Sequence, residues 1–159
     1  MAFKRERIHD IEQARAVIRK YCAYQERCHQ EVYRRLKDMG LGNEAVETLI
    51  GELVTEDYLS ETRFAALFVR SKWRQKHWGR RRLRLELQKR AINDRLIQSA
   101  LAEIDDDAYN QALQDLIVKW LDGAAFTAAR RQDLWQFLLR KGYESHLIES
   151  ALKALELTR

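Results

Sequence analysis

Cationic side chains crowd into one stretch near the middle of the chain. Residues 70–90 contain ten lysines and arginines and a single acid, Glu86. Two tryptophans, Trp73 and Trp78, stand among them. Guanidinium and ammonium groups bind phosphate or carboxylate, and aromatic rings stack on nucleic-acid bases. The stretch therefore indicates a surface for an acidic partner. The alternative is a solvated basic face that only keeps the protein soluble.

Gly79 divides this stretch into two helical patterns, of which the first begins at Glu61. A helix turns by about 100° per residue, so the basic positions of the first pattern share one narrow strip. That strip consists of Arg63, Arg70, Arg74 and His77. Phe64, Ala65 and Phe68 fall on the opposite side and are predicted to face the core.

Three consecutive arginines, Arg80 to Arg82, open the second helical pattern. Cations at a helix N-terminus oppose the macrodipole, at about 0.3–1 kcal/mol each when exposed. The same terminus offers unpaired N–H groups, and with guanidinium groups these form a strong anion site. We therefore expect the acidic partner to bind here. The candidate binding residues are Arg63, Arg70, Lys72, Arg74, Lys76, His77, Arg80, Arg81, Arg82 and Arg84.

The composition predicts an all-α globular protein. The 159 residues are 46% hydrophobic and 33% charged, and they include six glycines and no proline. Leu, Ala, Arg and Glu are abundant, and these residues favour helices. No apolar run approaches the roughly 20 residues that span a bilayer. The N-terminal segment also lacks the apolar region of a signal peptide. We expect a cytoplasmic monomer without a membrane partner.

The net charge of +5 is spread unevenly. Residues 1–54 hold ten basic and nine acidic side chains, residues 55–104 hold twelve and six, and residues 105–159 hold seven and nine. The three segments therefore carry +1, +6 and −2. The middle segment dominates the electrostatic field of the protein.

Catalytic and metal-binding patterns are weak in this sequence. Cys22, Cys28 and His29 are too few and wrongly spaced for a zinc site. The chain has no glycine-rich phosphate loop and no nucleophile elbow. Its four histidines form no pair with suitably spaced carboxylates. We expect no enzymatic activity, no cofactor and no metal.

An internal repeat of 51 residues organises the chain. The repeat aligns apolar positions such as Leu36, Leu87 and Leu138, which we expect to be equivalent and buried. It also aligns Asn43, Asp94 and Ser145, all of which are common helix N-cap types. These matches predict three tandem three-helix units over residues 1–57, 58–104 and 105–159. Such small units stack end to end, so we expect an elongated, curved array in which the first unit barely touches the third.

Individual residues make the chain resemble the RecX family over nearly its whole length. The matching residues are Leu59, Arg63, Phe64, Ala65, Phe68, Val69, Arg70, Gly79, Glu86, Leu87 and Ile92, then Leu138, Arg140, Lys141, Gly142, Tyr143, Leu147, Ile148, Ala151 and Leu152. Glu31, Val32 and Leu36 fit in the first unit. Two positions depart from the family pattern: Cys28 replaces a common Ser or Thr cap, and Ala91 replaces a glycine.

The resemblance implies a fold of three tandem three-helix repeats and a non-enzymatic function. RecX proteins are bacterial regulators of the RecA recombinase. They lie in the groove of the RecA–DNA filament and inhibit it, which restrains recombination, DNA repair and the SOS response. The implied partners are the RecA filament and single- or double-stranded DNA. The alternative is a helical module that binds DNA without RecA, which the basic and aromatic residues alone also support.

Overall fold

The computed structural model describes residues 10–158, which contain nine α-helices and no strand. The first nine residues of the predicted first unit, and Arg159, lie outside this range. The helices are α1 (Ile11–Tyr24), α2 (His29–Asp38), α3 (Asn43–Thr55), α4 (Glu61–Lys76), α5 (Arg80–Lys89), α6 (Asp94–Ala102), α7 (Asp106–Leu121), α8 (Ala128–Lys141) and α9 (Ser145–Leu157). The all-α prediction is confirmed.

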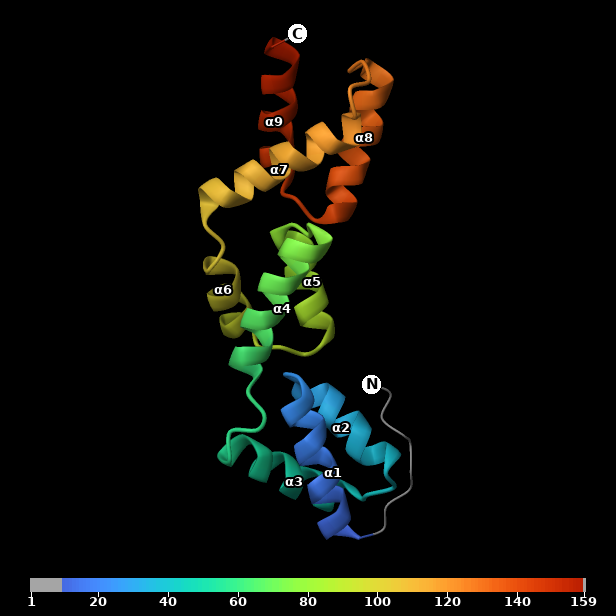
Figure 1. The fold of residues 1–159 in the computed structure, drawn as a ribbon, viewed down its shortest axis with the longest axis vertical. Coiled ribbons are helices and arrows are strands. Elements are labelled where there is room, and N and C mark those ends of the chain that lie inside the picture. The colour runs from blue at the N-terminus through green and yellow to red at the C-terminus, as the bar shows by residue number, and fades with distance from the viewer. Residues whose placement is uncertain (1–9, 159) are drawn as a thin grey trace.

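The helices form three successive groups of three along the long axis of the molecule (Figure 1). We call α1–α3 the first unit, α4–α6 the second unit and α7–α9 the third unit. The first unit lies at one end, the second in the middle and the third at the other end. The elongated array predicted from the repeat is therefore present.

The repeat places equivalent leucines in the cores of all three units. Leu36, Leu87 and Leu138 lie in α2, α5 and α8, and each is fully buried. The first unit has its own hydrophobic core. The second and third units share one continuous core, which also includes Cys28 from the first unit. The prediction of equivalent buried leucines is confirmed.

One local prediction was wrong. The N-cap residues of α3, α6 and α9 are Gly42, Asn93 and Glu144, one position before the predicted caps. Trp120 and Trp135 are only partly buried and pack at the edge of the shared core.

The second helix of each unit is followed by a left-handed residue. Gly40 (φ 91°) and Gly142 (φ 99°) follow α2 and α8, as the glycine positions predict. Ala91 takes the equivalent place after α5 with φ 56°, although its Cβ disfavours that conformation. This shared turn directs the chain back toward the third helix of each unit.

Candidate interface for an acidic partner

Helix α4 carries the first part of the predicted interface and is anchored as its pattern predicts. The Ser60 hydroxyl caps it by accepting a hydrogen bond from the Arg63 N–H at 3.2 Å. Phe64, Ala65 and Phe68 are all buried, so the predicted core face is confirmed. The opposite side of the helix faces solvent and carries the basic residues.

Arg63 lies between the first and second units rather than on an open surface. Its Nε donates to Glu26 Oε1 at 2.9 Å, and its terminal nitrogens donate to the Asp57 carboxylate at 2.7 Å and carbonyl at 2.8 Å. The hydrogen bond to Asp57, followed by that to Glu26, raises the pKa of Arg63. Because two carboxylates already neutralise it, Arg63 serves chiefly to join the units.

The rest of the strip presents cations to solvent. Arg70 is exposed and lies 4.0 Å from Glu103, at the limit of an ion pair. Arg74 and Lys76 are exposed, and neither forms an ion pair within residues 10–158. His77 is also exposed, but it follows the end of α4 with a left-handed φ of 58°. The predicted helical strip therefore ends before His77.

Trp78 is held by cations of the protein itself. The Arg82 guanidinium lies 4.3 Å from the centre of the Trp78 ring, and Lys72 Nζ lies 5.7 Å from it. Phe68 packs against the same ring at a centroid distance of 6.2 Å. Cation–π contacts of this kind position the two cations near the surface while leaving their charge uncompensated.

Three of the N–H groups at the start of α5 that we expected to be unpaired are already hydrogen-bonded, so that expectation was wrong for them. The Gly79 N–H donates to the Lys141 carbonyl at 2.7 Å, and the Arg81 N–H donates to the Gly142 carbonyl at 2.9 Å. The Arg80 N–H donates to the Tyr109 hydroxyl at 3.0 Å. The carbonyls at the end of α8 have the complementary polarity, so the two helix ends satisfy each other.

The Arg80 side chain is likewise occupied by the third unit. Its guanidinium pairs with Asp106 at 2.6 Å and Glu144 at 3.5 Å, and lies 3.9 Å from the centre of the Tyr109 ring. The Tyr109 hydroxyl donates a short hydrogen bond to Glu144. Burial, and then this hydrogen bond, raises the pKa of Tyr109. Arg80 therefore stabilises the contact between the second and third units.

Arg81, Arg82 and Arg84 line an open groove between α5 and the end of α8. The groove has a volume of about 730 Å³. Arg81 is exposed, Arg82 donates to the Arg140 carbonyl at 3.2 Å, and Arg84 pairs with Asp94 at 2.9 Å. Arg140 lines the same groove. Arg81 and Arg82 have no carboxylate partner within residues 10–158, so this groove retains a positive charge.

The structure adds basic residues of the third unit that the sequence pattern missed. Lys141 Nζ donates to the Lys76 carbonyl at 3.1 Å, which places it beside the end of α4. Burial lowers the pKa of Lys141, and the charges of Arg82, Lys76 and Lys119 lower it further. The sequence marks Lys141 only as part of a family-like helix ending. No basic run points to it as a binding residue, because the third unit is acidic overall.

Other chemistry has little support in the described part of the chain. Burial raises the pKa of Cys22 and Cys28 to about 11, so both remain neutral thiols near pH 7. No group of three or more potential metal ligands occurs among residues 10–158. Within the same range, no helix has the length and apolar character needed to cross a bilayer. The arrangement supports binding of anionic groups.

Comparison with known proteins identifies the family. The family model for RecX, second three-helix domain, matches residues 60–101. The regulatory protein RecX of Prosthecochloris aestuarii is 31% identical over 135 residues, which span 85% of this chain and 88% of that protein. The chain belongs to the RecX family. RecX of Amycolatopsis mediterranei is 30% identical over 135 residues, covering 82% of this chain and 76% of that protein.

A solved RecX structure has the same fold. The crystal structure of RecX from Lactobacillus salivarius superposes with a TM-score of 0.82, covering 92% of this chain and 97% of that one at 22% identity. The RecX domain match extends from the cap of α4 into α6 and therefore contains most of the candidate interface. Two residues, Cys28 and Ala91, depart from the RecX pattern. Cys28 is the N-cap of α2 and Ala91 follows the end of α5, and these two helix ends lie where the first unit meets the second.

Proposed function

We propose that the chain binds the RecA–DNA filament and inhibits the recombinase without catalysing a reaction, restraining DNA repair and the SOS response. Membership of the RecX family is the observation that carries this proposal. The elongated array supports it, because a long, narrow protein contacts several subunits of a filament at once. Action on RecA implies a bacterial cytoplasmic location.

The cations that we propose for the filament contact are those without a carboxylate partner. Among the predicted residues of the second unit these are Lys72, Arg74, Lys76, Arg81 and Arg82. Arg70 and Arg84 contribute more weakly because Glu103 and Asp94 lie beside them. Arg63 and Arg80 are assigned to the contacts between units instead. A groove lined by DNA phosphates and acidic side chains complements such a surface.

The proposal is tested by the ATP hydrolysis of RecA on single-stranded DNA at substoichiometric amounts of the chain. The parent should inhibit hydrolysis, whereas Arg74→Glu with Lys76→Glu should lose most of the inhibition and fold normally, because both residues are exposed. The matched control is Lys20→Glu with Arg34→Glu, the same charge change at exposed sites of the first unit. A parent without inhibition would refute the function. Loss of inhibition in the control pair alone would move the contact to the first unit.

Direct DNA binding without RecA is the second candidate, favoured by the uncompensated charge beside Trp78. The salt dependence of binding separates the two functions, because phosphate contacts release counterions. If inhibition of the filament survives at a salt concentration that abolishes binding to naked DNA, RecA itself is being recognised. If the two activities disappear together, DNA binding explains both.

A further inference from the structure

A second hollow lies where α4, α7 and α8 meet, away from the groove beside α5. It has a volume of about 300 Å³ and is lined by His77, Leu116, Lys119, Trp120, Phe137 and Lys141. We call it the junction pocket. Three of its residues are basic or histidine, two are aromatic and none is acidic. The groove beside α5, by contrast, is also lined by an acidic residue, Glu86.

The aromatic lining is held in place by the surrounding structure. Trp120 and Phe137 pack against the shared core, and their ring centres are 6.4 Å apart with an interplanar angle of 30°. The Arg130 guanidinium lies 4.7 Å from the centre of the Trp120 ring. Both rings are only partly buried, so they present apolar surface to the pocket. Anchored rings of this kind form platforms for nucleic-acid bases.

The cations around the pocket lack counter-ions. Lys76, Lys119 and Lys141 form no ion pair within residues 10–158, and Arg82 donates only to a carbonyl. The Lys141 ammonium is directed by its hydrogen bond to the Lys76 carbonyl and lies 5.7 Å from the centre of the Phe137 ring. Like charges held close together repel one another, and an anion from outside relieves that repulsion.

Size and chemistry together select the ligand. A hollow of about 300 Å³ is at the small end of ligand pockets and has room for one base. The bases of a duplex are stacked and paired, whereas those of a single strand expose their faces to protein rings. An acidic peptide would use the lysines but would leave the aromatic surface without a matching partner.

We propose that the junction pocket binds single-stranded nucleic acid, with one base against Trp120 and Phe137 and the flanking phosphates on Lys76, Lys119 and Lys141. The site spans the second and third units, so it exists only while these two are joined. This inference rests on the second candidate function, direct DNA binding, and deepens it by assigning that binding to a particular hollow between the second and third units.

The test measures binding of a labelled oligothymidylate of about 12 nucleotides by anisotropy, in the absence of RecA. Phe137→Leu should weaken binding by about tenfold because a stacking ring is lost. Lys119→Gln should lower the salt slope by about 0.7, corresponding to one phosphate contact. Lys153→Gln, an exposed lysine on α9, is the matched control and should bind like the parent. A thermal melt confirms that each variant is folded.

An oligonucleotide with abasic sites separates stacking from charge. The parent should bind it about tenfold more weakly than oligothymidylate, and Phe137→Leu should bind both equally. A duplex of equal length should not quench the fluorescence of Trp120, which is assigned by comparison with Trp120→Phe. Equal affinity of the parent for intact and abasic strands would overturn the proposal, as would parent-like binding by both Phe137→Leu and Lys119→Gln. Inhibition of RecA is measured separately, so either proposal can fail alone.

Discussion

The two junctions between units use the same elements but join them differently. The first junction connects the first and second units, and the second junction connects the second and third. In each, the start of one unit's second helix meets the end of the next unit's second helix. Gln30 donates to the Lys89 carbonyl at 3.5 Å in the first junction, and Arg82 donates to the Arg140 carbonyl at 3.2 Å in the second. The donors are 52 residues apart and the acceptors 51.

A second pair of contacts follows the same plan. His29 Nδ1 lies 3.8 Å from Glu61, the first residue of α4. Arg80, which is equivalent to His29 in the repeat, lies 2.6 Å from Asp106, the first residue of α7. The sequence repeat thus extends to the interfaces between units. The two junctions therefore share the same arrangement of contacts and differ in how closely the two units approach each other.

Two glycines account for much of that difference. A Cβ added to Gly79 would lie 2.5 Å from the backbone of Gly142, and one added to Gly142 would lie 2.3 Å from Arg82 Cβ. The backbones therefore touch at the second junction. Cys28 and Ala91 occupy the equivalent positions of the first junction, where no main-chain hydrogen bond joins the two units among residues 10–158. Glycine pairs thus allow direct main-chain hydrogen bonds between units.

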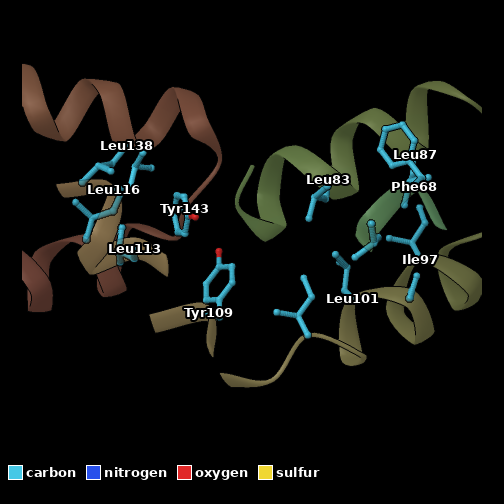
Figure 2. Packing of buried hydrophobic residues seen from close by; sticks show 14 of the residues in the cluster. Phe68, Leu83, Leu87, Ile97, Leu101, Tyr109, Leu113, Leu116, Leu138 and Tyr143 are labelled. Atoms are coloured by element: carbon cyan, nitrogen blue, oxygen red, sulfur yellow. The ribbon is translucent and has the colours of Figure 1, made fainter. Parts of the chain in front are cut away.

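The side-chain packing at the two junctions differs in the same way as the backbone contact. At the second junction, Tyr109 and Tyr143 fill the space between the leucines of the second and third units (Figure 2). Their ring centres are 5.2 Å apart, and both residues are fully buried. At the first junction the main side-chain links are partly exposed ion pairs, which contribute about 0–1 kcal/mol each. We infer that the first unit opens more readily than the other two separate.

The largest expected effect comes from truncating the core leucines. Leu87→Ala should cost about 2–5 kcal/mol and weaken both the second and third units, because they share one core. Leu36→Ala should cost a similar amount but act on the first unit alone. Hydrogen exchange measured by mass spectrometry should show faster exchange in α4–α9 for Leu87→Ala and only in α1–α3 for Leu36→Ala. Faster exchange throughout the chain in both variants would contradict the difference between the junctions.

The next effect tests the glycine contact directly. Gly142→Ala should cost about 2–4 kcal/mol, because it combines a left-handed φ with a clash against Arg82. Gly40→Ala is the matched control at the equivalent turn, where an added Cβ meets nothing within 4 Å, and should cost only about 1–2 kcal/mol. Chemical denaturation measures both values. Equal losses in the two variants would show that the backbone contact contributes nothing.

A smaller effect is expected at the buried tyrosine of the second junction. Tyr109→Phe removes the hydroxyl that accepts from the Arg80 N–H and donates to Glu144, and should cost about 1–2 kcal/mol at pH 7. Because the pKa of Tyr109 is raised, its contribution is complete below about pH 10 and is lost as the pH rises further. The stability difference between parent and variant should therefore shrink above pH 10. Tyr33→Phe, at an exposed position, is the control and should show no such trend.

The sequence could predict those features that depend on local periodicity. The burial of Leu36, Leu87 and Leu138 follows from helical spacing and a matched repeat, and the stops at Gly40 and Gly142 follow from glycine at a helix end. These signals act within a few residues. They do not depend on how the units are placed relative to one another.

The role of Arg80 could not be predicted in the same way. Its acidic partners, Asp106 and Glu144, lie 26 and 64 residues further along the chain, and no short-range pattern links them. From the sequence alone, an arginine at a helix start is typical of an open anion site, whereas in the fold the third unit lies beside Arg80 and occupies it. Arg74, whose position depends only on the face of α4, is exposed as its pattern predicts. Long-range packing therefore decides whether an arginine joins two units, as Arg80 does, or remains exposed, as Arg74 does.

The smallest effect concerns Ala91, which takes a glycine's place in the first junction. Ala91 is exposed and has a φ of 56°, a conformation that costs a residue with a Cβ about 1–2 kcal/mol. Ala91→Gly removes this strain but increases the entropy of the unfolded chain, which offsets about 0.5–1 kcal/mol. The net stabilisation should be about 0.5–1 kcal/mol, measured by chemical denaturation. Because Cys28, rather than a glycine, still occupies the position equivalent to Gly79, hydrogen exchange in α1–α3 should not change. Slower exchange there would mean that Ala91 alone holds the first junction apart, and that one glycine suffices to tighten it.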